Sequence, residues 1–264
     1  PCHRHRPLPA MKAALATAYG GPEVIRIAEV PTPTPKPNEL LMRIHASAVN
    51  AADWRLRSAN PWFVRLIFGP FKPRKPILGV VFAGEVVETG TATTTYKKGD
   101  RLFGWTSIMG LGGHAEFIAL RENGAFTRMP DGMTWTDAAA IPFGFGTARH
   151  FLSKANVSMG QRVLIYGASG AVGSAAVQLA KQLGAEVTGV CSTRNVELVR
   201  SLGAHEVLDY TKDALLSHRD SFDVVFETVG KLPFKDSLTL VKPQGTIITG
   251  SEMPAQMLTR LLGS

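Results

Sequence analysis

The chain has 264 residues, a formal net charge of +8, 45% apolar residues and 19% charged residues. This length allows one large or two ordinary domains, and the composition is that of a globular protein with a buried core. No apolar run reaches the roughly 18 to 20 residues that cross a bilayer, so we predict no integral membrane association.

The two cysteines, Cys2 and Cys191, are too few for a disulfide framework or for a zinc site of several thiolates. They favour a reducing compartment, and we predict a cytoplasmic protein. Residues 1–10 form a polar tail that lacks the apolar segment of a secretory signal. Met11 is the expected natural start, and a short organelle-targeting piece is the alternative.

The positive charge is scattered along the chain and is not gathered in one helix or stripe. No nucleic-acid-binding motif accompanies it, so we expect no nucleic acid as a partner. Attraction of an anionic cofactor, together with an ordinary solvated surface, accounts for the balance of charge.

Residues 11–134 consist of short runs rich in β-branched residues, separated by Pro, Gly and Asn, which indicates a mostly β domain. The predicted strands are Val24–Val30, Leu40–Val49, Val80–Val87, Arg101–Trp105 and Ala115–Leu120. The proline-rich segment 31–37 is interpreted as an extended surface loop, with an interdomain linker as the alternative.

The stretch from Trp54 to Lys75 mixes aromatic and basic side chains: Trp62, Phe63, Phe68 and Phe71 lie among Arg55, Arg57, Arg65, Lys72 and Arg74. We interpret it as an apolar lid over a small ligand. A membrane-touching surface and a segment that packs between domains are the alternatives.

Residues 135–264 alternate between strand and helix patterns, which predicts a parallel sheet covered by helices. The predicted strands are Arg162–Tyr166, Val187–Val190, Val207–Leu208, Val224–Phe226 and Thr246–Thr249. The first helix should present Val172, Ala176, Leu179 and Leu183 on one face and end at Gly184, and a second, near residues 196–202, should end at Gly203.

A glycine-rich turn joins the first of these strands to the first helix and reads Gly167-Ala168-Ser169-Gly170-Ala171-Val172-Gly173. The order strand, GxxGxxG, helix is typical of a turn that binds the diphosphate of a dinucleotide. The first glycine permits the tight turn, the second lets backbone approach the phosphates, and the third lets the helix pack on the strand. The helix N-terminus adds unpaired amides and a partial positive charge. The alternative is a glycine-rich turn without a ligand.

The end of the second strand favours NADPH over NADH. An NAD-specific domain carries an acid there, which accepts hydrogen bonds from the ribose 2′-hydroxyl. This chain carries Ser192, Thr193 and Arg194 instead. A guanidinium binds the 2′-phosphate that an acid would repel. The alternative is that the hydroxyls cap the next helix and Arg194 is solvated.

Further motifs extend along the chain: Ala46-Ser47-Ala48-Val49-Asn50-Ala51-Ala52-Asp53, Leu78-Gly79, Gly99-Asp100-Arg101-Leu102-Phe103-Gly104, Gly112-Gly113-His114-Ala115-Glu116-Phe117 and Ala138-Ala139-Ala140-Ile141-Pro142. With them, residues 11–251 resemble the medium-chain dehydrogenase/reductase superfamily, specifically its zinc-free quinone oxidoreductase and alkenal (enone) reductase branch. The resemblance implies an α/β protein with a mostly β, GroES-like catalytic domain (residues 11–134) and a doubly wound Rossmann NADP-binding domain (residues 135–264).

The resemblance also implies roles for single residues. Asn50, the one catalytic candidate, and Thr147 should lie near the nicotinamide. Ser192, Thr193, Arg194 and Tyr210 should surround the 2′-phosphate, with packing at a sheet edge as the alternative for Tyr210. Backbone should approach the cofactor at Val229, Gly230, Thr249 and Gly250.

The metal-dependent members of this superfamily carry a Cys ligand and a Gly-His-Glu motif, where this chain has Asn50-Ala51-Ala52-Asp53 and Leu78-Gly79-Val80-Val81. We therefore predict no metal, and His45, His114 and His150 are expected to be structural. Without a Lewis acid, hydride must reach a carbon that is already electrophilic, so quinones and α,β-unsaturated carbonyls are the predicted substrates.

Two alternatives to this reductase stay open. One is an NADPH-binding protein of the same fold with little or no activity and a regulatory role, because the Tyr that relatives carry after the Asn50 position is replaced and no proton donor stands out. The lesser one is a zinc-free alcohol dehydrogenase-like enzyme. Relatives continue beyond the fifth strand, so the nucleotide domain is expected to be truncated: a fragment, a shortened gene product or a chain completed by homodimerisation.

Overall fold

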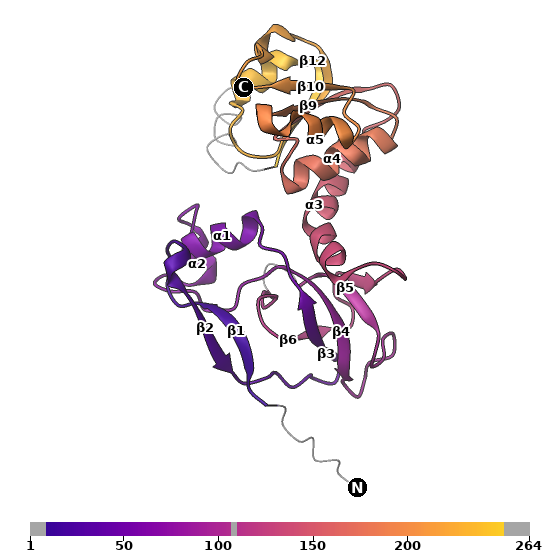
Figure 1. Cartoon of the computed structure of the whole chain (residues 1–264). Coiled ribbons are helices and arrows are strands. Elements are labelled where there is room, and N and C mark those ends of the chain that lie inside the picture. Colours follow the sequence, from indigo (N-terminus) through magenta and orange to yellow (C-terminus); the bar gives the residue numbers. More distant parts are fainter. Residues whose placement is uncertain (1–8, 107–109, 251–264) are drawn as a thin grey trace. The chain divides into compact units, whose positions relative to one another are not determined.

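The computed structural model describes residues 9–106 and 110–250. The chain forms two compact units, Pro1–Phe143 and Gly144–Ser264 (Figure 1). The helix α3 (Trp135–Lys154) begins at the predicted domain boundary and crosses the division between the units. Pro142 lies inside this helix and removes one helical hydrogen bond there.

The first unit is built on antiparallel strands, which confirms the prediction of a mostly β domain. Strands β1 (Met11–Ala16) and β2 (Ile25–Val30) pair with each other. The other strands form one sheet in the order β6-β3-β4-β5-β7. Their bounds are β3 Glu39–Ala46, β4 Val81–Thr89, β5 Arg101–Trp105, β6 Phe117–Arg121 and β7 Phe126–Arg128. Leu40, Met42, Phe82 and Leu102 are fully buried in its core.

Two short helices of the first unit were not predicted, α1 (Ala51–Ser58) and α2 (Val64–Phe68). The predicted strand 40–49 ends at Ala46, because the Ser47 hydroxyl donates to the Val81 carbonyl (2.8 Å) and the chain turns into α1. Val64 and Phe68 pack on a second core cluster that contains Leu56, Leu78 and Val80. Both helices are thus held by apolar contacts to the unit beneath them.

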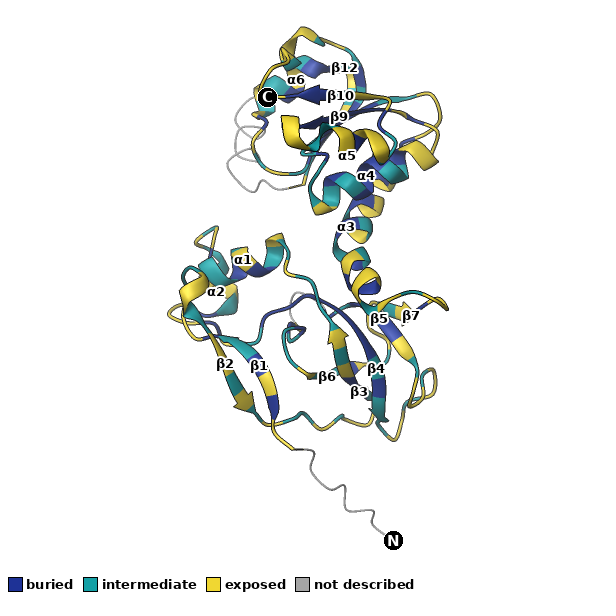
Figure 2. Ribbon diagram, viewed as in Figure 1, coloured by how far each residue is buried: buried dark blue, intermediate teal, exposed yellow. Residues whose placement is uncertain are grey.

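The second unit contains a five-stranded, wholly parallel sheet in the order β10-β9-β8-β11-β12, which confirms the predicted Rossmann-type fold. The strands are β8 Arg162–Tyr166, β9 Glu186–Cys191, β10 Glu206–Asp209, β11 Phe222–Glu227 and β12 Val241–Thr249. The helices are α4 Ala171–Gln182, α5 Val196–Ser201 and α6 Phe234–Leu240. In Figure 2, exposed residues lie on the outer sides of α4 and α5, and the strands are mostly buried.

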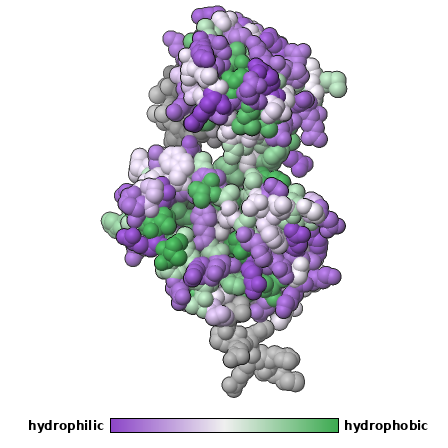
Figure 3. All heavy atoms as spheres, in the orientation of Figure 1, coloured by the Kyte–Doolittle hydropathy of each residue, from purple (hydrophilic) through white to green (hydrophobic). Residues whose placement is uncertain are grey.

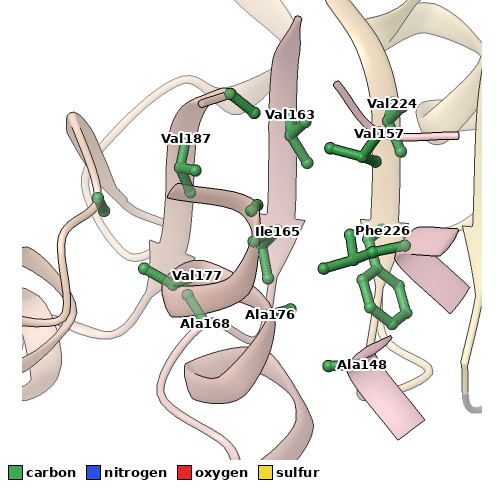
Figure 4. Close-up of a cluster of buried hydrophobic side chains, with 14 of the residues drawn as sticks. Ala148, Val157, Val163, Ile165, Ala168, Ala176, Val177, Val187, Val224 and Phe226 are labelled. Atoms are coloured by element: carbon green, nitrogen blue, oxygen red, sulfur yellow. The ribbon is translucent and has the colours of Figure 1, made fainter. Parts of the chain in front are cut away.

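The buried face of α4 differs in part from the prediction. The deeply buried positions are Gly173, Ala175, Ala176, Val177 and Ala180, and Leu183 is 44% exposed. Small side chains face the sheet because they let the helix lie close to the bulky strand residues, as Figure 4 shows for Ala176 and Val177 beside Ile165 and Phe226. Gly184 and Gly203 have the positive φ angles (80° and 106°) expected where these helices end.

No helix within residues 9–106 and 110–250 is long and apolar enough to cross a bilayer.

Phe226 is the largest side chain of the core between α4 and the sheet, and it is completely buried. We expect Phe226→Ala to lower the free energy of unfolding by about 3–5 kcal/mol, because it removes apolar contacts and leaves a cavity. Urea denaturation followed by circular dichroism measures this change. The control Leu198→Ala, at a position 48% exposed in α5, should cost no more than about 0.5 kcal/mol. Equal losses in both variants would contradict this account of the core.

Candidate functional site

The carboxyl ends of the five parallel strands of the second unit lie along one edge of the sheet. The strands β9 and β10 follow β8 on one side of it, and β11 and β12 lie on the other side. The order of the strands therefore reverses between β8 and β11, and in open α/β sheets ligands bind in the crevice at this point. The glycine-rich turn leaves β8 there.

Two glycines of this turn are required by close packing. Gly167 has φ +82°, and a Cβ atom there would lie 2.7 Å from Thr228 Oγ1. A Cβ atom on Gly173 would lie 2.1 Å from the Gly167 carbonyl oxygen. The first turn of α4 thus rests directly on the strand end, as the sequence interpretation of these two glycines requires.

Gly170 is different, because its side-chain position is open. A Cβ atom there would meet only the Gly167 carbonyl oxygen, at 3.4 Å. Gly170 is the N-cap residue of α4, and no side chain caps this helix. The amides of the first turn of a helix have no intrahelical partner and carry partial positive charge. The turn therefore fits the diphosphate of a dinucleotide, with space beside Gly170 and amide donors behind it.

Asn195 joins this turn to the end of β9. Its side-chain Nδ2 donates to Ser169 Oγ (3.0 Å) and to Ser192 Oγ (3.3 Å). The turn is held from the other direction by the amides of Gly167 and Ala168, which both donate to the Val190 carbonyl. Asn195 was missed in the sequence, because a polar residue at the start of a helix usually signals only a cap.

Ser192, Thr193 and Arg194 follow β9, where η2 (Thr193–Asn195) begins. The structure places them at the same edge as the turn. The Arg194 side chain is exposed and makes no hydrogen bond or ion pair within the described part of the chain. The Thr193 hydroxyl donates to the Asp209 carboxylate. Of the three, Ser192 and Arg194 have the freer polar groups.

Asp209 brings a carboxylate to this place from the end of β10, the third strand along the chain. It accepts hydrogen bonds from Thr193, from the Thr211 hydroxyl (2.7 Å) and from the Thr211 amide (2.9 Å), and the Lys212 ammonium lies 3.9 Å away. The hydrogen bond from Thr193, followed by those from Thr211 and the charge of Lys212, holds the pKa of Asp209 below its ordinary value, although burial opposes them. The end of β9 indeed lacks an acid, and the sheet supplies one beside it.

Tyr210 also lies at this edge. Its amide donates to the Cys191 carbonyl, and its ring stacks on Tyr166, with centroids 6.3 Å apart. The side chain is 53% exposed, so part of the ring is free for further contacts.

The end of β11 is organised by the buried carboxylate of Glu227. Its Oε1 atom accepts the amides of Val229 (2.9 Å), Gly230 (2.6 Å) and Lys231 (3.2 Å). The neighbouring strand β12 ends at Thr249, which pairs with Glu227, and the Gly250 amide donates to the Glu227 carbonyl. Val229, Gly230 and Thr249 therefore lie beside the glycine-rich turn, as expected from the strand order.

Thr147 belongs to the second unit, in α3. One turn earlier, a Cβ atom on Gly144 would lie 2.4 Å from the Ala171 carbonyl oxygen, so α3 packs against the first residue of α4. Thr147, three residues on, lies on the same side of α3.

Asn50 belongs to the first unit, where it is the N-cap residue of α1. Its Oδ1 accepts the Ala52 amide (2.9 Å), and the Asp53 carboxylate accepts the Asn50 amide (2.9 Å), which completes a capping box. Asp53 is buried, also accepts the Gly79 amide (3.0 Å), and lies 4.0 Å from His114 Nε2. Asn50 Nδ2 and His114 Nε2 are buried without a hydrogen-bond partner among the described residues. The capping role was missed, although the pattern Asn-x-x-Asp could have revealed it.

The three histidines singled out in the sequence are not gathered. His45 stacks on Trp135, with centroids 4.3 Å apart, His114 faces Asp53, and His150 lies beside Phe151. In residues 9–106 and 110–250, no three His, Cys, Asp or Glu side chains are grouped so that they could hold a metal ion.

These features define a two-part nucleotide-binding oxidoreductase fold, and comparison with known proteins identifies the family. Residues 36–131 match the alcohol dehydrogenase GroES-like domain family and residues 171–259 the zinc-binding dehydrogenase family. The chain is 35% identical to a chloroplast envelope quinone oxidoreductase homolog of Arabidopsis thaliana, over 94% of this chain and 77% of that protein. It is 31% identical to an NADPH-dependent alkenal/one oxidoreductase of the same plant, over 92% of this chain and 64% of that protein.

Among solved structures, the quinone oxidoreductase from Coxiella burnetii is similar, with a TM-score of 0.87 and 28% identity over 96% of this chain and 80% of that one. The chain thus belongs to the zinc-free quinone oxidoreductase branch of the medium-chain dehydrogenase/reductase superfamily, as predicted, and it is an oxidoreductase that uses a nicotinamide cofactor.

The lowered pKa of Asp209 generates a prediction about pH. Because the folded pKa lies below the ordinary value of 3.8, the ionised carboxylate stabilises the fold above about pH 3.8, and this contribution is lost as the pH falls through the folded pKa. We expect Asp209→Asn to melt below the wild type at about pH 7 and to approach it at about pH 2.5. Thermal unfolding at both pH values tests this. The exposed Asp131→Asn control should follow the wild type, and a Tm difference for Asp209→Asn that is constant with pH would contradict the assignment.

Proposed function

We propose that this oxidoreductase binds NADPH at the glycine-rich turn and reduces quinones or α,β-unsaturated carbonyl compounds. The observation that carries the proposal is the open position at Gly170, in front of an uncapped helix N-terminus, at the point where the strand order reverses. The residues that would hold the diphosphate are 167–173.

The preference for NADPH rests on Arg194 and Ser192. An exposed guanidinium without an ion partner is a strong donor for a 2′-phosphate. The Asp209 carboxylate is nearby, but four donor groups surround it and offset its charge. Tyr210 would add a partly exposed ring to the same end of the site.

When bound, NADPH supplies the hydride. The contribution of the chain is to orient the substrate and to stabilise negative charge on its oxygen. The Asn50 side chain suits the second task, because its Oδ1 is fixed by the Ala52 amide and its Nδ2 remains a donor without a partner among the described residues. The names of two relatives support this substrate class: an NADPH-dependent alkenal/one oxidoreductase and a 2-methylene-furan-3-one reductase of Solanum lycopersicum.

The cellular location and a homodimeric state are proposals of the same kind. A buried free thiol at Cys191 suits a reducing compartment, whereas several relatives are named as chloroplastic.

The turnover test follows NADPH oxidation by its absorbance, with a quinone, with an alkenal and with a simple ketone. We expect consumption with the first two and little with the ketone, which lacks an activated carbon. Binding of NADPH without consumption by either activated substrate would favour the binding-protein alternative. Equal or faster reduction of the ketone would favour the alcohol dehydrogenase-like one.

A pair of glycine variants separates cofactor binding from folding. Gly170→Ala should keep the unfolding free energy within about 1 kcal/mol of the wild type, because its methyl group meets no protein atom closer than 3.4 Å. The same methyl group would occupy the space for the phosphates, so NADPH affinity, measured by calorimetry, should fall about tenfold or more. Gly173→Ala is the contrasting variant and should destabilise the fold by about 1–3 kcal/mol. Unchanged NADPH affinity in Gly170→Ala would refute the site.

Cofactor preference is tested with Arg194→Gln. Loss of a charge-assisted hydrogen bond should raise the KM for NADPH by roughly 10- to 100-fold and leave the KM for NADH nearly unchanged. Arg200→Gln, a nearby exposed arginine of α5 that pairs with Glu197, is the matched control and should behave as the wild type. A parallel change of both KM values would show that Arg194 does not read the 2′-phosphate.

A further inference from the structure

The surface formed by α1, α2 and the segment that follows them exposes large apolar side chains. Phe71 is 89% exposed, Trp62 71%, Leu66 68%, Ile67 53% and Trp54 41%. Figure 3 shows hydrophobic atoms among hydrophilic ones in the region where Figure 1 draws α1 and α2. Exposed apolar side chains scattered singly are ordinary, but five within residues 54–71 form a group that calls for a partner.

The orientation of α2 shows that this exposure is not a packing accident. Val64 and Phe68, one helical turn apart, face the core of the first unit. Arg65, Leu66 and Ile67 occupy the outward side, and Trp62 lies one turn before Leu66. A surface helix ordinarily places polar residues outward. Here both sides of the helix are apolar, and the outward one has no cover among the described residues.

The same surface is strongly cationic. Residues 54–75 include Arg55, Arg57, Arg65, Lys72, Arg74 and Lys75, and no Asp or Glu. The contacts of three of these side chains leave their charge uncompensated: Arg55 lies over Trp54, Arg65 over Tyr19, and Arg57 donates to the Gly20 carbonyl. Lys72 and Arg74 are exposed, and neither forms an ion pair in the part of the chain that the structure describes. We call residues 54–75 the apolar–basic surface.

We propose that the apolar–basic surface docks this protein peripherally on an anionic lipid bilayer. Charge complementarity selects the partner: anionic headgroups neutralise lysine and arginine, and the apolar side chains enter the boundary with the acyl chains. Tryptophan favours this interfacial depth, and long basic side chains reach from it toward the headgroups. A nucleic acid would use the cations but would leave Leu66, Ile67 and Phe71 in water. The proposal goes beyond the proposed function and does not depend on it, since it uses no cofactor-binding residue.

The test is co-sedimentation of the whole chain with vesicles of phosphatidylcholine alone and of phosphatidylcholine mixed with phosphatidylglycerol. We expect binding to the mixed vesicles only, weakened by salt. Two variants divide the contributions: Trp62→Ser with Phe71→Ser removes apolar contacts, and Lys72→Gln with Arg74→Gln removes charge. Each double variant should weaken binding about tenfold, and the charge variant should also depend less on salt.

Matched controls carry the same changes elsewhere on the first unit. Ile27→Ser alters a side chain that is 72% exposed on β2, and Lys97→Gln with Lys98→Gln removes two exposed cations. Both should bind vesicles as the wild type does. Absence of binding to anionic vesicles, or equal binding by the surface variants and the wild type, would overturn the proposal. Loss of a dimer in gel filtration by Trp62→Ser with Phe71→Ser, without vesicle binding by the wild type, would assign the surface to a second copy of the chain.

Discussion

The arrangement of the second unit depends on the close approach of α4 to the end of β8. Nothing larger than a hydrogen atom fits on Gly173 against the Gly167 carbonyl, and Gly167 itself requires a positive φ angle. This contact fixes the direction of α4, and with it the position of its free amides at the edge of the sheet. The packing of Gly144 on Ala171 and the hydrogen bonds of Asn195 to Ser169 and Ser192 then join α3 and the end of β9 to the same point.

The acids along this edge act on the protein rather than on a ligand. Glu227 satisfies three backbone amides, Asp209 collects the donors of residues 193 and 211, and Asp53 in the first unit does the same for the start of α1. Because a buried carboxylate must be hydrogen-bonded, these acids also fix the loops that donate to them. What remains for a ligand is mainly donor in character: the α4 amides, the Arg194 guanidinium and the Asn50 amide nitrogen. A donor-rich site suits a polyanionic cofactor and a substrate that develops negative charge on oxygen.

The sequence was sufficient for the parallel sheet and the glycine-rich turn, because both depend on local patterns: apolar strands bounded by glycine, and glycines at fixed spacing. It was not sufficient where tertiary contacts decide. The helices α1 and α2 have weak apolar periodicity and form because a capping box and a few core contacts hold them. Leu183 was assigned to a buried face that small residues occupy instead, and Asp209 is eighteen residues from Cys191 in the chain yet adjacent in the sheet. A pairing of strands, unlike a turn, cannot be seen in one stretch of sequence.

The proposed chemistry and the proposed membrane surface are consistent in physical terms. Hydrophobic quinones and long-chain enones concentrate in the apolar part of a bilayer, because transfer of apolar surface out of water is favourable. NADPH, with its phosphates, stays in water. A reductase that lies on the bilayer through Trp62, Leu66 and Phe71 would meet both reactants at the interface that separates them. In that arrangement, the exposed apolar side chains that would be a liability for a freely diffusing protein instead raise the local concentration of its substrate.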